Sequence, residues 1–225
     1  MTSVSSVARF YMKREAIVVA AGKSQRCGED KLYFSIKGKP LIFYTLERII
    51  SVLSHVSLVC AEEKLKWWKD VPYRLKVIPG GAERQDSVSA GLSALDEDTG
   101  LVLIHDGARP FVQECLIEKV IEEAEKEGAA VAGLPITETI KQVEGLWVKQ
   151  TLSRDNIWSI QTPQAFKREI IVSAYKKGYE VGFFGTDCAS LVERAGFAVK
   201  VVLGDKGNIK VTTRDDLIMA EKLLE

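Results

Sequence analysis

The chain has 225 residues, an apolar content of 46%, and equal numbers of basic and acidic residues, 31 of each. This length and apolar content predict a single domain over residues 1–225 with a sizeable hydrophobic core. Zero net charge argues against general nucleic-acid binding, which favours a basic surplus. No apolar run approaches the length of a membrane span, so neither a nucleic acid nor a membrane is expected as a partner.

The four cysteines lie far apart in the chain and form no C-x-x-C pair. A zinc site or a disulfide framework is therefore not expected, and a reducing cytoplasm is the expected location. Residues 1–15 contain no apolar block with a cleavage site, so they do not resemble a secretory signal.

The first two thirds of the chain predict strands and helices in alternation. Residues 16–20 form a continuous apolar run, typical of a strand buried on both faces, and Pro40 suits the first turn of a helix reaching about Leu53. Further strands are predicted at 56–60, 75–78, 101–104 and 129–134, and further helices at 62–69, 84–95 and 113–126. Repeated βαβ units predict an α/β fold, with a mostly parallel twisted sheet covered by helices on both faces.

This alternation breaks at residues 138–152, where two runs of alternating polar and apolar residues flank a turn at Glu144 and Gly145. The pattern predicts a β-hairpin arm. A hairpin of this size has no core of its own, so it must lie on its parent domain or on a partner. Beyond it we expect strands at 157–161 and 198–202 and helices starting at Lys167, near Asp187 and at Thr213.

The end of the first predicted strand is the first candidate for a binding site. Ligands of open α/β sheets bind outside the carboxyl ends of the strands, and here Gly22 is followed by the cations Arg26 and Lys31. The segment lacks both G-x-G-x-x-G and G-x-x-x-x-G-K-[ST], so neither a dinucleotide fingerprint nor a P-loop is supported. The two cations could hold phosphate oxygens; the alternative is that they are solvated surface charges.

A second candidate is the segment HDGARP, residues 105–110, at the end of a buried strand. Asp106 there could reach Mg²⁺, with phosphate and water as the other ligands. The alternatives are that Asp106 caps the turn or pairs with Arg109. His105 is expected to pack or to form a hydrogen bond rather than to bind a metal.

Two further candidates are less distinctive. In residues 80–88 the glycines let backbone amides approach a ligand and Ser87 offers a hydroxyl, although the segment could be an ordinary loop that starts a helix. Lys210 and Arg154 have no periodic role, and each could equally be a surface charge.

Six motifs, taken in this order and spacing, resemble the 2-C-methyl-D-erythritol 4-phosphate cytidylyltransferase family of the non-mevalonate isoprenoid pathway: AAGKSQR, GGAERQDSVSAGL, HDGARP, QTPQAF, TDCASLVERAG and GNIKVT. The resemblance runs from about Ala16 to the C-terminus. It implies a fold of the nucleotide-diphospho-sugar-transferase type and a Mg²⁺-dependent reaction in which CTP and methylerythritol phosphate give a CDP-alcohol and pyrophosphate. It also implies a homodimer whose hairpin arms cross.

The resemblance implies a role for each matched residue. Arg26 and Lys31 would stabilise the transition state at the α-phosphorus, and Arg154 and Lys210 would hold the substrate phosphate. Cytosine and ribose contacts are implied for Ala20, Ala21, Gly22, Gly81 and Ser87; metal and substrate contacts for Asp106 and Arg109; and positions near methylerythritol phosphate for Thr139, Thr162 and Thr186.

The chain departs from the family pattern in the loop before Lys31. Ser24 and Cys27 stand where the family has glycine and methionine, and the loop is shorter, which leaves Lys23 as an alternative to Lys31. Two other functions stay open: a related cytidylyltransferase for ribitol 5-phosphate, and a non-catalytic nucleotide-binding protein of the same fold. The absence of a nucleophile–base pair is expected, because an anionic phosphate oxygen needs positioning and charge stabilisation more than a general base.

Overall fold

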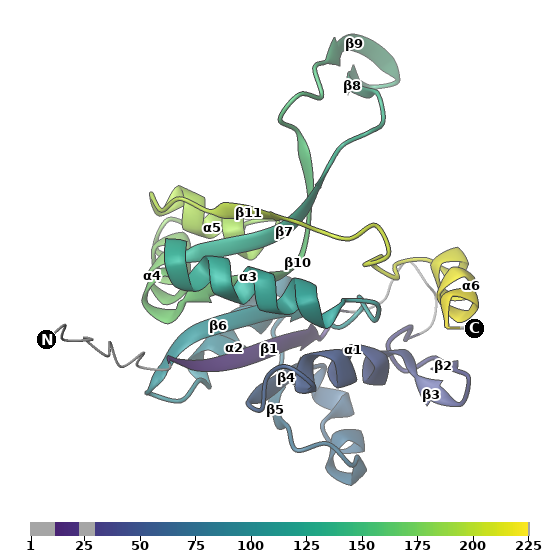
Figure 1. Ribbon diagram of the computed structural model, residues 1–225, viewed down its shortest axis with the longest axis vertical. Helices are drawn as coiled ribbons and strands as arrows, with labels where there is room; N and C mark the ends of the chain where they lie inside the picture. Colours follow the sequence, from purple (N-terminus) through teal and green to yellow (C-terminus); the bar gives the residue numbers. More distant parts are fainter. Residues whose placement is uncertain (1–11, 23–29, 225) are drawn as a thin grey trace, which may run out of the picture.

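A seven-stranded sheet forms the centre of the computed structural model, which describes residues 12–22 and 30–224 (Figure 1). The strand order is β11-β7-β10-β6-β1-β4-β5, and all neighbours are parallel except that β10 runs antiparallel to both β6 and β7. The mostly parallel α/β sheet is therefore confirmed. The strands are β1 (Lys13–Ala20), β4 (Val56–Cys60), β5 (Lys76–Pro79), β6 (Thr99–Asp106), β7 (Ala129–Pro135), β10 (Trp158–Lys167) and β11 (Lys200–Leu203).

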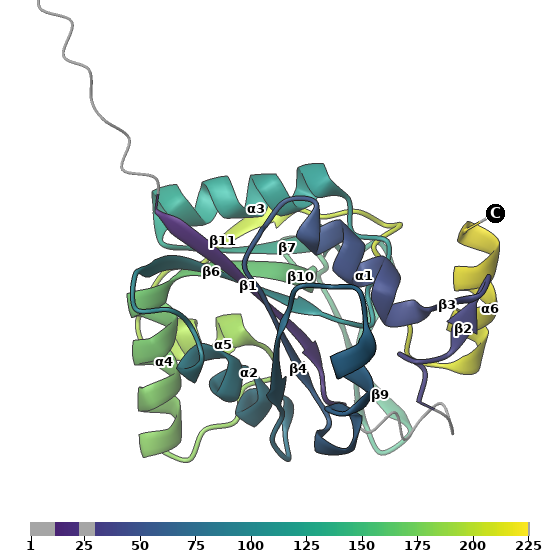
Figure 2. The same cartoon turned by 90° about the horizontal axis from the view of Figure 1, so that it is seen from below.

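Helices cover both faces of the sheet, as the sequence predicts (Figure 2). One face carries α1 (Leu41–Ile50) and α3 (Glu114–Glu127), and the other carries α2 (Arg84–Ser93), α4 (Arg168–Glu180) and α5 (Cys188–Arg194). Successive side chains of β1 alternate between the two layers: Val18 packs into the core on the α1 side and Ile17 into the core on the α2 side. This alternation explains why the strand is apolar throughout rather than at every second residue.

Capping side chains set the starts of the last two helices. The Asp187 carboxylate accepts a hydrogen bond of 2.9 Å from the backbone N–H of Ser190, at the start of α5. The Thr213 hydroxyl accepts one of 3.2 Å from the N–H of Asp216 in α6 (Arg214–Leu223). Each bond satisfies an N–H group that a helix start leaves unpaired. In the part of the chain that the structure describes, no helix has the length and apolar content needed to span a bilayer.

The strand predicted at 157–161 continues to Lys167 as β10. Two short segments also differ from the prediction. Residues 62–69 do not form one α-helix but two 3₁₀ turns, η1 (Glu62–Lys64) and η2 (Trp67–Asp70). Pro72 disfavours a helical Val71, and burial of the large Trp68 ring fixes the second turn against the core. The sequence also gave no sign of the short pair β2 (Ser35–Ile36) and β3 (Lys39–Pro40), because strands of two residues carry too little pattern.

The predicted hairpin is present as β8 (Ile140–Glu144) and β9 (Trp147–Leu152), and it stands away from the body of the protein (Figure 1). Every residue of β9 is exposed. Among the large apolar side chains of the described residues, the most exposed are those of Leu146, in the turn before β9, at 97%, and of Trp147, at 84%. Nothing in the described part of this chain covers these apolar side chains, so the alternation along the arm does not mark a face buried within the chain.

Candidate active site

A pocket of about 520 Å³ opens where β1 and β6 end, between the turn before α2, the turn that contains Lys31 and the segment before α6. Its position at the carboxyl ends of parallel strands is the usual ligand site of an open α/β sheet. The predicted site residues that line it are Ala20, Ala21, Gly22, Lys31, Gly81, Ser87, Asp106 and Lys210. The pocket therefore gathers residues from Val19 to Lys210, which are 191 positions apart in the sequence.

The turn between β5 and α2 forms one wall of the pocket. Its backbone lies close to the end of β1. A Cβ atom added at Gly80 would lie 2.3 Å from Cβ of Ala21, so a side chain at residue 80 cannot fit there. The Ser87 hydroxyl accepts a hydrogen bond of 3.2 Å from the N–H of Gly81 and donates one of 3.1 Å to the carbonyl of Glu83. This hydroxyl fixes the turn and keeps one lone pair with which to accept from a ligand.

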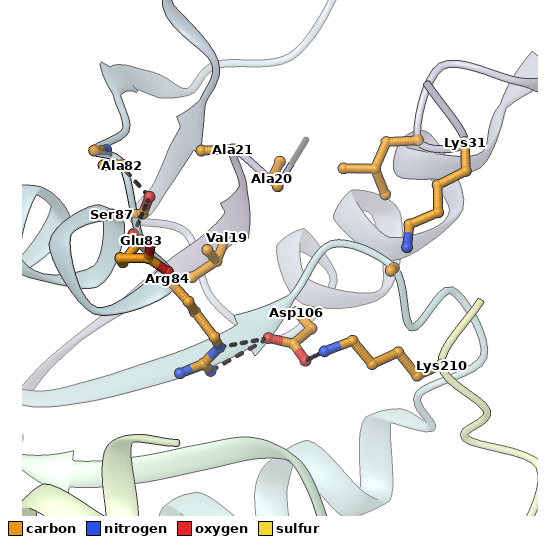
Figure 3. Close-up of a pocket in the computed structure, with 14 residues that line it drawn as sticks. Val19, Ala20, Ala21, Lys31, Ala82, Glu83, Arg84, Ser87, Asp106 and Lys210 are labelled. Atoms are coloured by element: carbon orange, nitrogen blue, oxygen red, sulfur yellow. Dashed lines mark hydrogen bonds and ion pairs between the residues drawn. The ribbon is translucent and has the colours of Figure 1, made fainter. Parts of the chain in front are cut away.

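Asp106 lies between two cations on the pocket floor (Figure 3). Its Oδ2 atom lies 2.7 Å from Nζ of Lys210, and its Oδ1 atom lies 3.2 Å from a guanidinium nitrogen of Arg84. Burial raises the pKa of the Asp106 carboxyl, but the charges of Arg84 and Lys210 outweigh burial and hold this pKa well below its usual range. The carboxylate is therefore ionised and oriented before any ligand arrives.

Arg109 does not pair with Asp106, which was one alternative open to the sequence. Its guanidinium instead donates a hydrogen bond of 2.7 Å to the carbonyl of Asn208, in the loop that carries Lys210. The same loop is held by the buried Asn208 amide, which donates to the carbonyl of Thr162 at 2.8 Å. Arg109 and Asn208 thus fix the backbone from which Lys210 projects.

His105 is fully buried and forms a hydrogen bond, as expected from the sequence. Its Nε2 atom lies 3.1 Å from the carbonyl of Arg109, and burial lowers the pKa of His105 to about 4. The imidazole is therefore neutral at neutral pH, with Nε2–H as the donor, and it supports the turn after β6 rather than facing the pocket.

Lys31 reaches into the pocket from the side opposite Arg84 (Figure 3). It lies in a turn whose next residue, Leu32, is buried against the core. Arg26, the predicted partner of Lys31, and Lys23, the alternative to it, lie outside the described residues.

Of the predicted contacts for the second substrate, Asp106 and Lys210 line this pocket, whereas Arg109, Arg154, Thr139, Thr162 and Thr186 do not. Arg154 and Thr139 are exposed at the base of the hairpin arm, where the Arg154 guanidinium donates to the carbonyl of Thr137. Thr186 is exposed before α5. Thr162 is buried, and its hydroxyl accepts a hydrogen bond of 3.0 Å from the backbone N–H of Asp106.

Arg84 is a pocket residue that was not predicted from the sequence. It lines the pocket and holds Asp106, yet it stands inside the quoted motif GGAERQDSVSAGL without an assigned role. One signal was available: a cation at the first position of a helix opposes the helix dipole, which favours anions there. A nearby anion offsets this unfavourable interaction, and here the anion is Asp106.

The donor set fits a metal held mainly by substrate. Among residues 12–22 and 30–224, no group of three or more His, Cys, Asp or Glu side chains could enclose a metal ion. Two carboxylates of described residues line the pocket, those of Glu83 and Asp106, and Asp106 is the one that lies between Arg84 and Lys210. Mg²⁺ is commonly bound in this way, by one or two carboxylates with phosphate oxygens and water.

Comparison with known proteins gives consistent similarities over nearly the whole chain. A model of the family described as 2-C-methyl-D-erythritol 4-phosphate cytidylyltransferase matches residues 15–225. A relative of that name from Dictyoglomus thermophilum is 46% identical over 220 residues, covering 92% of this chain and 95% of the relative. Another, from Caldanaerobacter subterraneus, is 42% identical over 227 residues, covering 95% of this chain and 99% of the relative.

Solved structures share the fold. The crystal structure of 4-diphosphocytidyl-2C-methyl-D-erythritol synthase from Anaerococcus prevotii matches with a TM-score of 0.85 at 32% identity, covering 95% of this chain and 98% of that one. The crystal structure of 2-C-methyl-D-erythritol 4-phosphate cytidylyltransferase from Thermus thermophilus matches with a TM-score of 0.80 at 31% identity, covering 94% and 98%.

Proposed function

The chain belongs to the 2-C-methyl-D-erythritol 4-phosphate cytidylyltransferase family, and we propose that the pocket around Asp106 is its active site. The enzyme transfers CMP from CTP to 2-C-methyl-D-erythritol 4-phosphate, in the isoprenoid pathway. A phosphate oxygen of the alcohol phosphate forms a bond to the α-phosphorus of CTP, the bond to the bridging oxygen of the β-phosphate breaks, and pyrophosphate leaves. The observation that carries the proposal is the convergence of Lys31, Arg84 and Lys210 on one pocket with a glycine-lined wall.

The nucleotide is proposed to lie against the wall formed by Ala20, Ala21 and Gly22 on one side and by Gly81 and Ser87 on the other. Small side chains and exposed backbone there leave room for a flat base. The remaining lone pair of the Ser87 hydroxyl is suited to accept from an amine or a hydroxyl of the nucleoside. In this pose the triphosphate extends toward Lys31 and Asp106.

The cations have separate proposed roles. Lys31, with Arg26, stabilises negative charge on the oxygens around the α-phosphorus, and Lys210 holds the phosphate of the attacking alcohol phosphate. Two anions must be brought together in this reaction, so fixed positive charge supplies most of what the protein has to add. Arg84 keeps the charge of Asp106 compensated when Lys210 turns to a substrate phosphate, because it holds the other carboxylate oxygen.

Transfer of this kind is generally metal-dependent, and Mg²⁺ is the proposed metal, with Asp106 as its protein ligand. When bound, the metal would neutralise phosphate charge and order the triphosphate. The ionised carboxylate of Asp106 in the pocket supports this assignment. Its two oxygens are paired with Arg84 and Lys210 in the free protein, so a metal would replace one of these cations.

The remaining proposed contacts to the alcohol phosphate are Arg109, Arg154, Thr139, Thr162 and Thr186. Arg154 and Thr139 lie at the base of the arm and do not line the pocket of their own chain. We propose a homodimer formed through residues 138–152, in which each arm brings these two residues to the site of the other chain. The uncovered Leu146 and Trp147 at the tip of the arm support an interface there.

We also propose a single-domain organisation and a cytoplasmic location. All seven strands of the main sheet come from one continuous chain, which supports treating residues 1–225 as one nucleotidyltransferase domain with an arm. The free thiols of Cys60, Cys115 and Cys188 support a reducing cytoplasm as the location.

Pyrophosphate release tests the proposed function. The purified protein is assayed with CTP and Mg²⁺, adding methylerythritol phosphate or ribitol 5-phosphate in turn. Release with methylerythritol phosphate alone is the expected result. Release with ribitol 5-phosphate alone would instead assign the related activity, and CTP binding without release from either substrate would indicate a non-catalytic nucleotide-binding protein.

A further inference from the structure

The turn that carries Lys31 is held by its own backbone and by the start of α1. The N–H of Tyr33 donates a hydrogen bond of 2.9 Å to the carbonyl of Asp30, and the carbonyl of Leu32 accepts one of 2.9 Å from the N–H of Ile42. Leu32 is only 4% exposed and lines the pocket beside Lys31. The backbone at Lys31 is therefore tied to the packed body of the protein.

Lys64, in the first 3₁₀ turn, contacts this turn on both sides of Lys31. Its Nζ atom lies 3.1 Å from Oδ2 of Asp30. The same ammonium stands 4.3 Å from the centre of the Tyr33 ring, within the range of a cation–π contact. One side chain thus links the residue before Lys31 to the residue two positions after it.

Tyr33 belongs in turn to a cluster of four aromatic rings, those of Tyr33, Phe43, Trp67 and Trp68, which we call the aromatic platform. The indole N–H of Trp68 donates a hydrogen bond of 2.9 Å to the Tyr33 hydroxyl, and Trp68 is 3% exposed. Tyr33 also meets the edge of Trp67, with ring centres 4.9 Å apart. Phe43 from α1 packs against both tryptophans. The segment that carries Lys64 is thereby fixed to the same body as the Lys31 turn.

We propose that Lys64 is a positioning residue for Lys31: bound to Asp30 and Tyr33 over the aromatic platform, it fixes the turn from which Lys31 reaches the reacting phosphate. This inference rests on the role proposed above for Lys31. A lysine acts as a point charge on a long flexible stem, so the place of its charge depends on how firmly its backbone is held. A misplacement of about 1 Å in such a group can slow a reaction by about a hundredfold.

The test is a double-mutant cycle of Lys64→Met and Lys31→Ala, with Lys69→Met as the matched control. Lys69 is an exposed lysine of η2, in the same segment as Lys64. Lys64→Met is expected to lower kcat by about tenfold with the KM for the alcohol phosphate and the melting temperature little changed. In the Lys31→Ala background the same substitution should have almost no further effect on kcat. Lys64→Arg, which keeps the charge over the Tyr33 ring, should restore most of the rate, and Lys69→Met should behave as the unsubstituted enzyme.

Three results would overturn the inference, and they separate it from the proposed function. An equal loss from Lys64→Met in both backgrounds would mean that Lys64 does not act through Lys31. If Lys64→Met leaves kcat unchanged while Lys31→Ala lowers it, then Lys64 does not position Lys31, and the proposed role of Lys31 is unaffected. A Lys31→Ala enzyme with full kcat would refute the role of Lys31 itself, and the positioning role of Lys64 with it.

Discussion

Lys210 and Asp106, which are 104 positions apart in the chain, form an ion pair of 2.7 Å on the floor of the pocket. The carboxylate end of this pair is nearly buried, whereas the Lys210 side chain is 39% exposed. The ammonium can therefore turn toward a substrate phosphate while Arg84 keeps the carboxylate in place. The pair connects the proposed metal ligand directly to the proposed phosphate holder.

Replacing Lys210 by Ala is expected to lower kcat by about a hundredfold or more, because a charge that compensates the meeting of two anions is lost. The melting temperature should change little, since the side chain is partly exposed. Steady-state kinetics with both substrates measures the effect, and Lys206→Ala, an exposed lysine of the same loop, is the control. Activity close to that of the control would remove Lys210 from the site.

Replacing Ser87 by Ala is expected to raise the KM for CTP by about tenfold with a smaller effect on kcat. The buried hydroxyl both fixes the Gly81 turn and offers a lone pair to the nucleoside. Loss of its hydrogen bonds should also lower the free energy of unfolding by about 1 kcal/mol. Ser93→Ala, at the exposed C-terminal end of the same helix, is the matched variant, and an equal KM for the two proteins would contradict the contact.

Replacing both Leu146 and Trp147 by Ser is expected to weaken dimerisation at least about tenfold while leaving the chain folded. These side chains are almost fully exposed in the single chain, so its own stability does not depend on burying them. Sedimentation velocity over a range of protein concentrations measures the association. A dimer as tight as that of the unsubstituted protein would rule out the tip of the arm as an essential part of the interface.

Mixing two inactive variants tests whether Arg154 serves the other chain. Arg154→Ala and Lys210→Ala each remove one half of the phosphate-binding pair. If the arm crosses over, a mixed dimer keeps one site with both residues intact, and random mixing restores about a quarter of the full activity. The two variants are unfolded and refolded together, then assayed against each variant refolded alone. No gain over the separate variants would place Arg154 at the site of its own chain.

The stability of the protein is expected to fall as the pH drops from 6.5 toward 4. Burial lowers the pKa of His105 from 6.5 to about 4, so the unfolded chain binds one more proton than the native protein in this interval. The loss approaches about 3 kcal/mol at the acidic end. Urea unfolding at several pH values between about 7 and 4 measures this change in the free energy of unfolding. His105→Gln, which keeps an N–H donor for the Arg109 carbonyl, should flatten the dependence, and an unchanged slope in that variant would assign it to another group.

Local sequence patterns predicted most of the sheet and the helix starts. The apolar run of β1, Pro40 before α1 and Thr213 before α6 act through neighbouring residues, so a single chain segment is enough to read them. The position of Asp106 followed from the same logic, because the carboxyl end of a buried strand is where ligands bind in such sheets.

The pairing of Asp106 with Arg84 could not be predicted from local sequence patterns. It depends on which helix packs beside the end of β6, and this follows from the strand order of the whole sheet. The two 3₁₀ turns at Glu62–Asp70 were likewise decided by the packing of Trp67 and Trp68 with Tyr33 and Phe43, which are distant in sequence. Arg154 is a third case, because its proposed partner belongs to another chain.

A crystal structure of the protein with CTP and Mg²⁺ would show directly whether the pocket around Asp106 binds the nucleotide and the metal. We expect cytosine between Ala21 and Ser87, the α-phosphate within reach of the Lys31 ammonium, and the metal on the Asp106 carboxylate with Arg84 still in contact. A nucleotide bound outside this pocket, or a metal held without Asp106, would contradict this expectation.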